Sequence, residues 1–175
     1  MKKRAAESVA DVLKKVRILL VSESCELTGS LFANGGVGVP RAGEIPAKTE
    51  ALLEGKYHDD GTRVCIRYKE SELTGMEGST TSVSFQKNDP GVISMLRDGA
   101  VKTALIFEQG QRHLCVYQTP IMPFEVGVYT KKVHNGIEKE GVLEMDYTVE
   151  IRGAQAERTK FQMRVLPYFD KPGQK

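Results

Sequence analysis

Cysteine is scarce in this chain of 175 residues, and what there is of it forms no recognisable pattern. The three cysteines, Cys25, Cys65 and Cys115, are odd in number and widely spaced. This spacing provides neither a disulfide framework nor a paired metal-binding motif. We therefore expect each to be a small buried thiol in a protein of a reducing, cytoplasmic compartment.

The net charge is also small, and long apolar runs are absent near the N-terminus. The formal net charge is +2, from 25 basic and 23 acidic side chains, which does not predict the clustered basic surface that nucleic-acid binding requires. The longest apolar run near the N-terminus, Ile18 to Val21, is too short to cross a bilayer. Charged residues also interrupt the segment that a signal peptide would keep apolar. We expect no nucleic-acid partner, no membrane span and no secretory leader.

Alternating apolar and polar residues, in contrast, fill most of the chain from Tyr57 to Val165. Side chains of a strand point alternately to its two faces, so this period indicates strands with one buried face. Gly, Asp, Asn and Pro separate the segments at nearly regular intervals, as turns do between strands. The pattern predicts ten strands, at about 16–24, 49–57, 62–70, 80–86, 92–97, 102–108, 113–119, 124–133, 142–152 and 158–166.

The connections between these segments are short, which favours antiparallel neighbours, since parallel strands need crossovers of a dozen residues or more. A meander of this size tends to close because closure removes exposed edges. We therefore predict an all-β, antiparallel up-and-down barrel of about eight to ten strands, in a single domain over residues 1–175. A helical stripe in residues 6–16 predicts a short N-terminal helix, so that residues 1–15 form a helix and tail. Residues 28–46 are a Gly-rich loop and residues 168–175 a flexible tail.

Few segments of the sequence indicate catalytic or ligand-binding chemistry. Glu70, Glu72 and Glu77 lie in the most polar stretch and could serve as general acid and base, but solvated or ion-paired carboxylates are the more favoured interpretation. His113 and Cys115 share one strand face at nearly 7 Å, by a rise of about 3.3 Å per residue, which is long for direct activation of a thiol. Tyr129 beside Lys131 could bind an anionic head group, or face water on the outer wall.

Metal and cofactor signals are weaker still. His58, His113 and His134 lie on different segments that no motif links. We predict no metal site, no cofactor and no catalytic residue.

Six blocks of the sequence form a recognisable series: 54–57, 68–78 with 80–81, 97–101, 107–114, 117–120 and 127–131. The most specific parts are Thr-Gly-Met-Glu-Gly at 74–78 and Gly-Val-Tyr-Thr-Lys at 127–131. These blocks resemble the YwiB-like family of uncharacterised bacterial β-barrel proteins. The resemblance runs in order from about Val16 to Val165 and departs from the family at 28–46, where the connection is enlarged. It implies a lipocalin- or calycin-like barrel with an internal cavity, and no known activity.

A barrel of this size can hold one small ligand, so the first hypothesis is a module that binds a small hydrophobic or amphipathic molecule. Its candidate ligand-binding residues, chosen because they fall in the family-like blocks, are Glu70, Arg97, His113, Tyr117 and Tyr129. The second hypothesis is a protein-interaction or structural domain acting through the barrel exterior, for instance as a homodimer. The third, less favoured, is an enzyme with Glu70 or His113 as general base.

Overall fold

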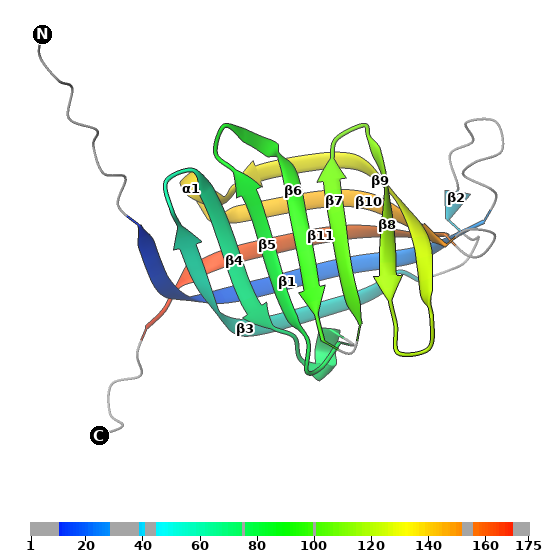
Figure 1. The fold of residues 1–175 in the computed structure, drawn as a ribbon, viewed down its shortest axis with the longest axis horizontal. Helices are drawn as coiled ribbons and strands as arrows, with labels where there is room; N and C mark the ends of the chain where they lie inside the picture. Colours follow the sequence, from blue (N-terminus) through cyan, green and yellow to red (C-terminus); the bar gives the residue numbers. More distant parts are fainter. Residues whose placement is uncertain are drawn as a thin grey trace, which may run out of the picture.

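Neighbouring segments of the chain pair in sequence order to form a continuous antiparallel sheet (Figure 1). The computed structural model describes residues 11–28, 39–40, 45–74, 76–99, 101–151 and 156–169. The strands are β1 (Val12–Thr28), β2 (Val39–Pro40), β3 (Ala47–Asp59), β4 (Arg63–Lys69), β5 (Thr80–Gln86), β6 (Asp89–Asp98), β7 (Lys102–Glu108), β8 (Arg112–Gln118), β9 (Pro123–Gly136), β10 (Val142–Ile151) and β11 (Ala156–Pro167). A 3₁₀ turn, η1 (Glu72–Thr74), follows β4, and a helical turn, α1 (Ile137–Glu140), joins β9 to β10.

The sheet closes where its first and last long strands meet. β1 pairs with β11 from Val16 opposite Pro167 to Leu27 opposite Ala156, and with β3 on its other side. The two-residue β2 adds only to the end of β1, so the barrel wall consists of the other ten described strands. The predicted all-β up-and-down barrel is confirmed.

The barrel is flattened, with two walls that cross. In Figure 1, β4 to β7 run steeply across the front, while β10, β11 and β1 run nearly horizontally behind them. Strand twist produces this crossing in closed sheets. Residues far apart in the sequence therefore face one another across the interior.

The alternation seen in the sequence sorts side chains between interior and solvent. In β7, Thr103, Leu105 and Phe107 are buried and the residues between them are exposed. The largest fully buried side chains are apolar and come from strands all round the wall: Ile18, Ile66, Ile93, Phe107, Leu143 and Met163. Removal of this apolar surface from water provides the main favourable free energy of folding.

One glycine, Gly55 of β3, permits a close approach between β3 and its two neighbouring strands. A Cβ atom on Gly55 would overlap the Ile18 side chain and lie 2.8 Å from the Arg67 carbonyl oxygen. Gly55 lies between Val16 of β1 and Tyr68 of β4 in the register. Only a residue without a side chain lets these strands pack at this distance.

The α1 end of the barrel is fastened by ion pairs. Lys87, in the turn between β5 and β6, lies 2.7 Å from Asp59 at the end of β3 and 3.0 Å from Glu138 of α1. Ile137 of α1 is buried against the core. The barrel is thus packed at this end.

The predicted N-terminal helix is wrong over the residues that can be described. Val12 to Val16 belong to β1, where they pair with Asp59 to Gly55 of β3. Ladder hydrogen bonds and burial of Val16 outweigh the helical stripe, because a helix this short has little stability of its own. Residues 1–10 of that prediction lie outside the described residues, as do 29–38 and 41–44 of the Gly-rich loop and 170–175 of the tail.

Candidate functional site

A row of inward-facing residues crosses the front wall at one level. Each member is the register partner of the next across β4 to β9: Tyr68, Thr81, Arg97, Thr103, Tyr117 and Phe124. The row arises because the strands keep their alternation beyond the apolar core. At this level of the barrel the inward positions hold mostly polar or amphipathic residues. Hydroxyl, guanidinium and aromatic groups thereby line one level of an otherwise apolar interior.

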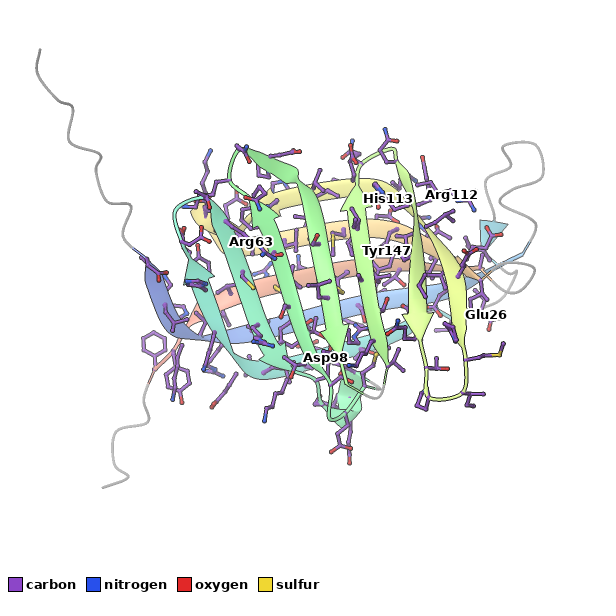
Figure 2. The ribbon with its side chains drawn as sticks, in the orientation of Figure 1. Glu26, Arg63, Asp98, Arg112, His113 and Tyr147 are labelled. Atoms are coloured by element: carbon purple, nitrogen blue, oxygen red, sulfur yellow. The ribbon has the colours of Figure 1, made fainter. Side chains whose placement is uncertain are left out.

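A cavity of about 440 Å³, partly open to solvent and with the exposed Ile151 and Glu157 in its lining, lies next to this row. Its charged lining residues are Glu70, Arg97 and Glu157, and its tyrosines are Tyr68, Tyr117 and Tyr147. Leu20, Met95, Leu105, Val149, Ile151 and Phe161 supply apolar lining from both walls. Tyr147 of β10, labelled in Figure 2, contacts the opposite wall, since its ring centroid lies 4.7 Å from that of Phe107 on β7. The cavity is amphipathic, with a polar side and an apolar side.

Glu70 and Arg97 form a buried ion pair beside the cavity. Oε1 of Glu70 lies 3.5 Å from Nε of Arg97, and the two side chains are 3% and 14% exposed. The Thr81 hydroxyl donates to the same Oε1 at 2.5 Å and accepts a longer bond, 3.4 Å, from Nε of Arg97. The Glu70 backbone N–H donates to the Ser79 carbonyl, which fixes the loop that carries η1. The carboxylate thus has a cation and a hydroxyl donor, as a buried charge requires.

Arg97 uses only part of its donor capacity in this arrangement. Within the described chain its hydrogen bond and ion pair both involve Nε. The two terminal nitrogens, Nη1 and Nη2, have no described protein partner, and Arg97 lines the cavity. A guanidinium offers five N–H donors in a planar fork, so most of this fork remains available to a molecule in the cavity.

The three tyrosines of the cavity stay protonated well above neutral pH. Burial raises the pKa of Tyr147 to about 12, more than the Arg97 charge lowers it. Burial also raises the pKa of Tyr68 and of Tyr117. The neighbouring Thr103 hydroxyl slightly lowers the Tyr117 pKa, although its oxygen lacks hydrogen-bond geometry with any described partner. All three phenols are therefore neutral hydrogen-bond donors at physiological pH.

The five residues expected from the sequence fall into two groups. Glu70, Arg97 and Tyr117 come together at the cavity. His113 faces inward on β8 but is not among the lining residues; its Nε2 lies 3.3 Å from a Glu108 carboxylate oxygen without hydrogen-bond geometry. Tyr129 is 47% exposed and points to the outside of β9.

Sequence reasoning missed other residues of the cavity. Tyr147 of β10 and Glu157 and Thr159 of β11 line it from the back wall. They lie outside the blocks that resemble the YwiB-like family. The alternation of Leu143, Met145 and Tyr147 was a signal that Tyr147 faces inward, but which front-wall residues it meets depends on the crossing of the walls.

The other chemical possibilities receive little support from the geometry. Glu72 and Glu77 are exposed, so they do not share the environment of Glu70. Cys115 is buried, and burial raises the pKa of its thiol, which disfavours a nucleophilic thiolate. In the part of the chain that the structure describes, no three His, Cys, Asp or Glu side chains come close enough to hold a metal ion. None of the helices in these same parts is long and apolar enough to cross a membrane.

The closed, ten-stranded antiparallel barrel agrees with the calycin-like architecture that the resemblance implied. The chain belongs to the family described as "Domain of unknown function (DUF1934)", whose model matches residues 39–163 of the 175. No curated protein matches it.

The fold is similar to that of a solved structure, the crystal structure of the YwiB protein from Bacillus subtilis. The two chains are 18% identical, with a TM-score of 0.59 over 87% of this chain and 94% of that one. At this identity the likeness concerns the fold. With the family match, it confirms the YwiB-like resemblance.

Proposed function

We propose that the protein binds a small amphipathic molecule inside its barrel. The observation that carries this proposal is the cavity of about 440 Å³ with Glu70, Arg97 and Tyr117 in its lining. Small-molecule sites typically have volumes of about 300–1,000 Å³ and combine an apolar wall with a few convergent polar groups. The volume, the apolar residues and the polar side of this cavity agree with that description.

The buried ion pair favours binding over a purely structural role. An ion pair buried in a core is often no more stabilising than apolar residues of the same volume, because both charges lose water. Most of the remaining interior of this barrel is packed with aliphatic and aromatic side chains, with a few buried polar residues such as Ser84 and Thr130. A charged pair with spare donors is therefore more useful for a ligand than for stability.

The neutral, fluorescent amphiphile 1-aminoanthracene provides a test. We expect it to bind the wild-type protein saturably, in a 1:1 complex. Val149→Trp should abolish binding by filling the cavity, which Val149 lines. Val116→Trp is the matched control, because Val116 is exposed on the outer face of β8.

Absence of saturable binding to the wild-type protein would overturn the proposal. Equal affinity of the two folded tryptophan variants would also overturn it, because the probe would then lie outside the barrel. Native mass spectrometry of the purified wild-type protein provides a second readout, a co-purified small molecule.

A second candidate function is protein interaction through the outer face of β6 to β8, for instance as a homodimer. It is favoured by exposed apolar side chains on these adjacent strands: Leu96, Ile106, Leu114 and Val116. Sedimentation equilibrium distinguishes it, since a dimer that dissociates in Leu114→Asp would support this candidate.

The free thiols are compatible with a cytoplasmic location, which we retain as part of the proposal.

A further inference from the structure

We propose that the ligand of the cavity carries a singly charged carboxylate head group, which binds to Nη1 and Nη2 of Arg97. This inference rests on the proposed function and specifies the chemistry of its ligand. It concerns the polar side of the cavity, where Arg97, Tyr117 and Tyr147 are all lining residues.

The first argument is the orientation of the Arg97 side chain. Glu70 and Thr81 hold it through Nε alone, at 3.5 and 3.4 Å. This contact fixes the plane of the guanidinium and leaves its terminal edge without a described protein partner. Arginine binds carboxylates through two parallel N–H bonds from such an edge. Glu70 therefore acts as a positioning residue, and the bound carboxylate would occupy the opposite side of the fork.

The second argument is the supply of neutral donors in the cavity and beside it. Tyr117 and Tyr147 line the same cavity and keep their phenolic protons at neutral pH. Thr103, between Arg97 and Tyr117 in the register, has a buried hydroxyl with no hydrogen-bond partner among the described residues. A buried hydroxyl without a partner, such as that of Thr103, is costly in a protein interior. A carboxylate, which only accepts hydrogen bonds, is suited to this group of donors.

The charge of the lining favours a monoanion over a dianion. The cavity has one cation, Arg97, and two carboxylates, Glu70 and Glu157. Glu157 is exposed to solvent and Arg97 is already paired with Glu70, so the repulsion of a bound anion comes mainly from Glu70 and grows with the charge of that anion. A single carboxylate needs only the spare half of the Arg97 fork.

The apolar lining indicates what the head group is attached to. Leu20, Val149, Ile151 and Phe161 cover another part of the same cavity. Such a surface binds an aliphatic or aromatic body by removing it from water. The expected ligand is therefore an amphipathic monocarboxylate.

Four amphiphiles with aliphatic tails of nine or ten carbons and different head groups test this inference. They are decanoate, decanol, decyl phosphate and decyltrimethylammonium, each titrated against the 1-aminoanthracene complex of the wild-type protein. We expect decanoate to displace the probe at a concentration at least about tenfold lower than decanol, which corresponds to about 1.4 kcal/mol for the charge-assisted bonds. Decyl phosphate and decyltrimethylammonium should be weaker than decanoate.

A pair of arginine variants assigns the effect to the proposed site. Arg97→Met should reduce the preference for decanoate over decanol to about onefold without abolishing decanol binding. Arg67→Met is the matched control, because Arg67 is exposed on β4, and should keep the preference. If Arg97→Met does not fold, the double variant Glu70→Gln with Arg97→Met removes both charges together and should show the same loss.

The outcomes separate this inference from the proposed function. If 1-aminoanthracene binds in the cavity but decanoate displaces it no more effectively than decanol, the proposed carboxylate head group is wrong. The proposal that the protein binds a small amphipathic molecule would then remain. Preference for decyltrimethylammonium would also overturn the inference, and would indicate that the three tyrosines bind a cation through their ring faces. Preference for decyl phosphate would overturn the inference of a carboxylate and would indicate a phosphate head group instead. If no wild-type cavity binding is found, both proposals fail.

Discussion

Thr81 shows how much a single hydroxyl contributes to this site. It is fully buried, donates to Glu70 and accepts from Arg97. The residue has no charge and no distinctive motif, so its role becomes apparent only when β4, β5 and β6 are placed in register. Arg97 and Glu70 were predicted from the sequence as ligand-binding candidates, but their pairing through Thr81 was not.

Thr81→Val should therefore destabilise the protein. The substitution keeps the shape and leaves Oε1 of a buried carboxylate without its hydroxyl donor, which costs about 1.5–3 kcal/mol for a hydrogen bond to a charged group. The free energy of unfolding, from urea denaturation at neutral pH, measures the loss. Thr81→Ser, which keeps the hydroxyl, is the control. A valine variant as stable as the wild type would show that the hydrogen bond contributes nothing.

Pairs of strands contribute a second level of organisation, best seen in β10. The register of β10 with β9 runs from Gly136 to Lys132 and then shifts between Asp146 and Tyr147. Without the shift, Tyr147 would be opposite Lys131; with it, Tyr147 is opposite the buried Thr130. Such a bulge keeps inward residues of both strands facing the interior. The sequence predicted both strands, but the bulge depends on how the two pack together.

The pairing of β10 with β11 includes a two-point ion pair that makes stability depend on pH. Nε and Nη2 of Arg158 donate to the two carboxylate oxygens of Asp146 at 2.8 and 2.6 Å. The Arg158 hydrogen bonds lower the pKa of Asp146 below its ordinary value. Because the folded pKa lies below the unfolded one, about 3.9, the stabilisation is complete above the unfolded pKa and is lost as the pH falls through the folded pKa.

We accordingly expect Asp146→Asn to be destabilising at pH 7, and this deficit to shrink progressively as the pH falls below about 3.9. The readout is the difference between the free energies of unfolding of the wild type and the variant, measured by urea denaturation between pH 7 and pH 2. A difference that stays constant over this range would mean that the ion pair does not contribute. Asp98→Asn, in an exposed pair with Lys102, is the matched control and should change stability little at any pH.

At the scale of the whole molecule, the barrel interior is divided between a packed apolar part and a polar cavity. Aliphatic and aromatic side chains fill it towards α1, and the polar cavity occupies the level of the Tyr68 to Phe124 row. Tyrosines from the front and back walls meet this cavity, so several strands contribute to one environment. Because their phenols are buried, the stability of the barrel should depend on pH in the alkaline range.

The barrel should therefore lose stability above pH 10. A tyrosine of the unfolded chain ionises near pH 10, whereas Tyr147 in the folded protein retains its proton up to about 12. Between these values the unfolded state binds fewer protons, so stability falls by about 1.4 kcal/mol per pH unit for this group. Tyr147→Phe should reduce the slope of unfolding free energy against pH by about that amount between pH 10 and 11.5. Tyr129→Phe, on the outer surface, is the comparison variant; an unchanged slope in Tyr147→Phe would contradict the assignment.

The sequence by itself determined the ten strands, their alternation and their antiparallel order, because these depend on local turns and on a period of two along each strand. The family-like blocks also led to Glu70, Arg97 and Tyr117, which line the cavity. Only the tertiary structure decided that Val12 to Val16 join β1 instead of a helix, that Tyr129 faces outward, and that Tyr147 and Glu157 complete the cavity. Register, bulges and the crossing of the walls set these contacts, and they arise from packing between strands that lie far apart in the chain.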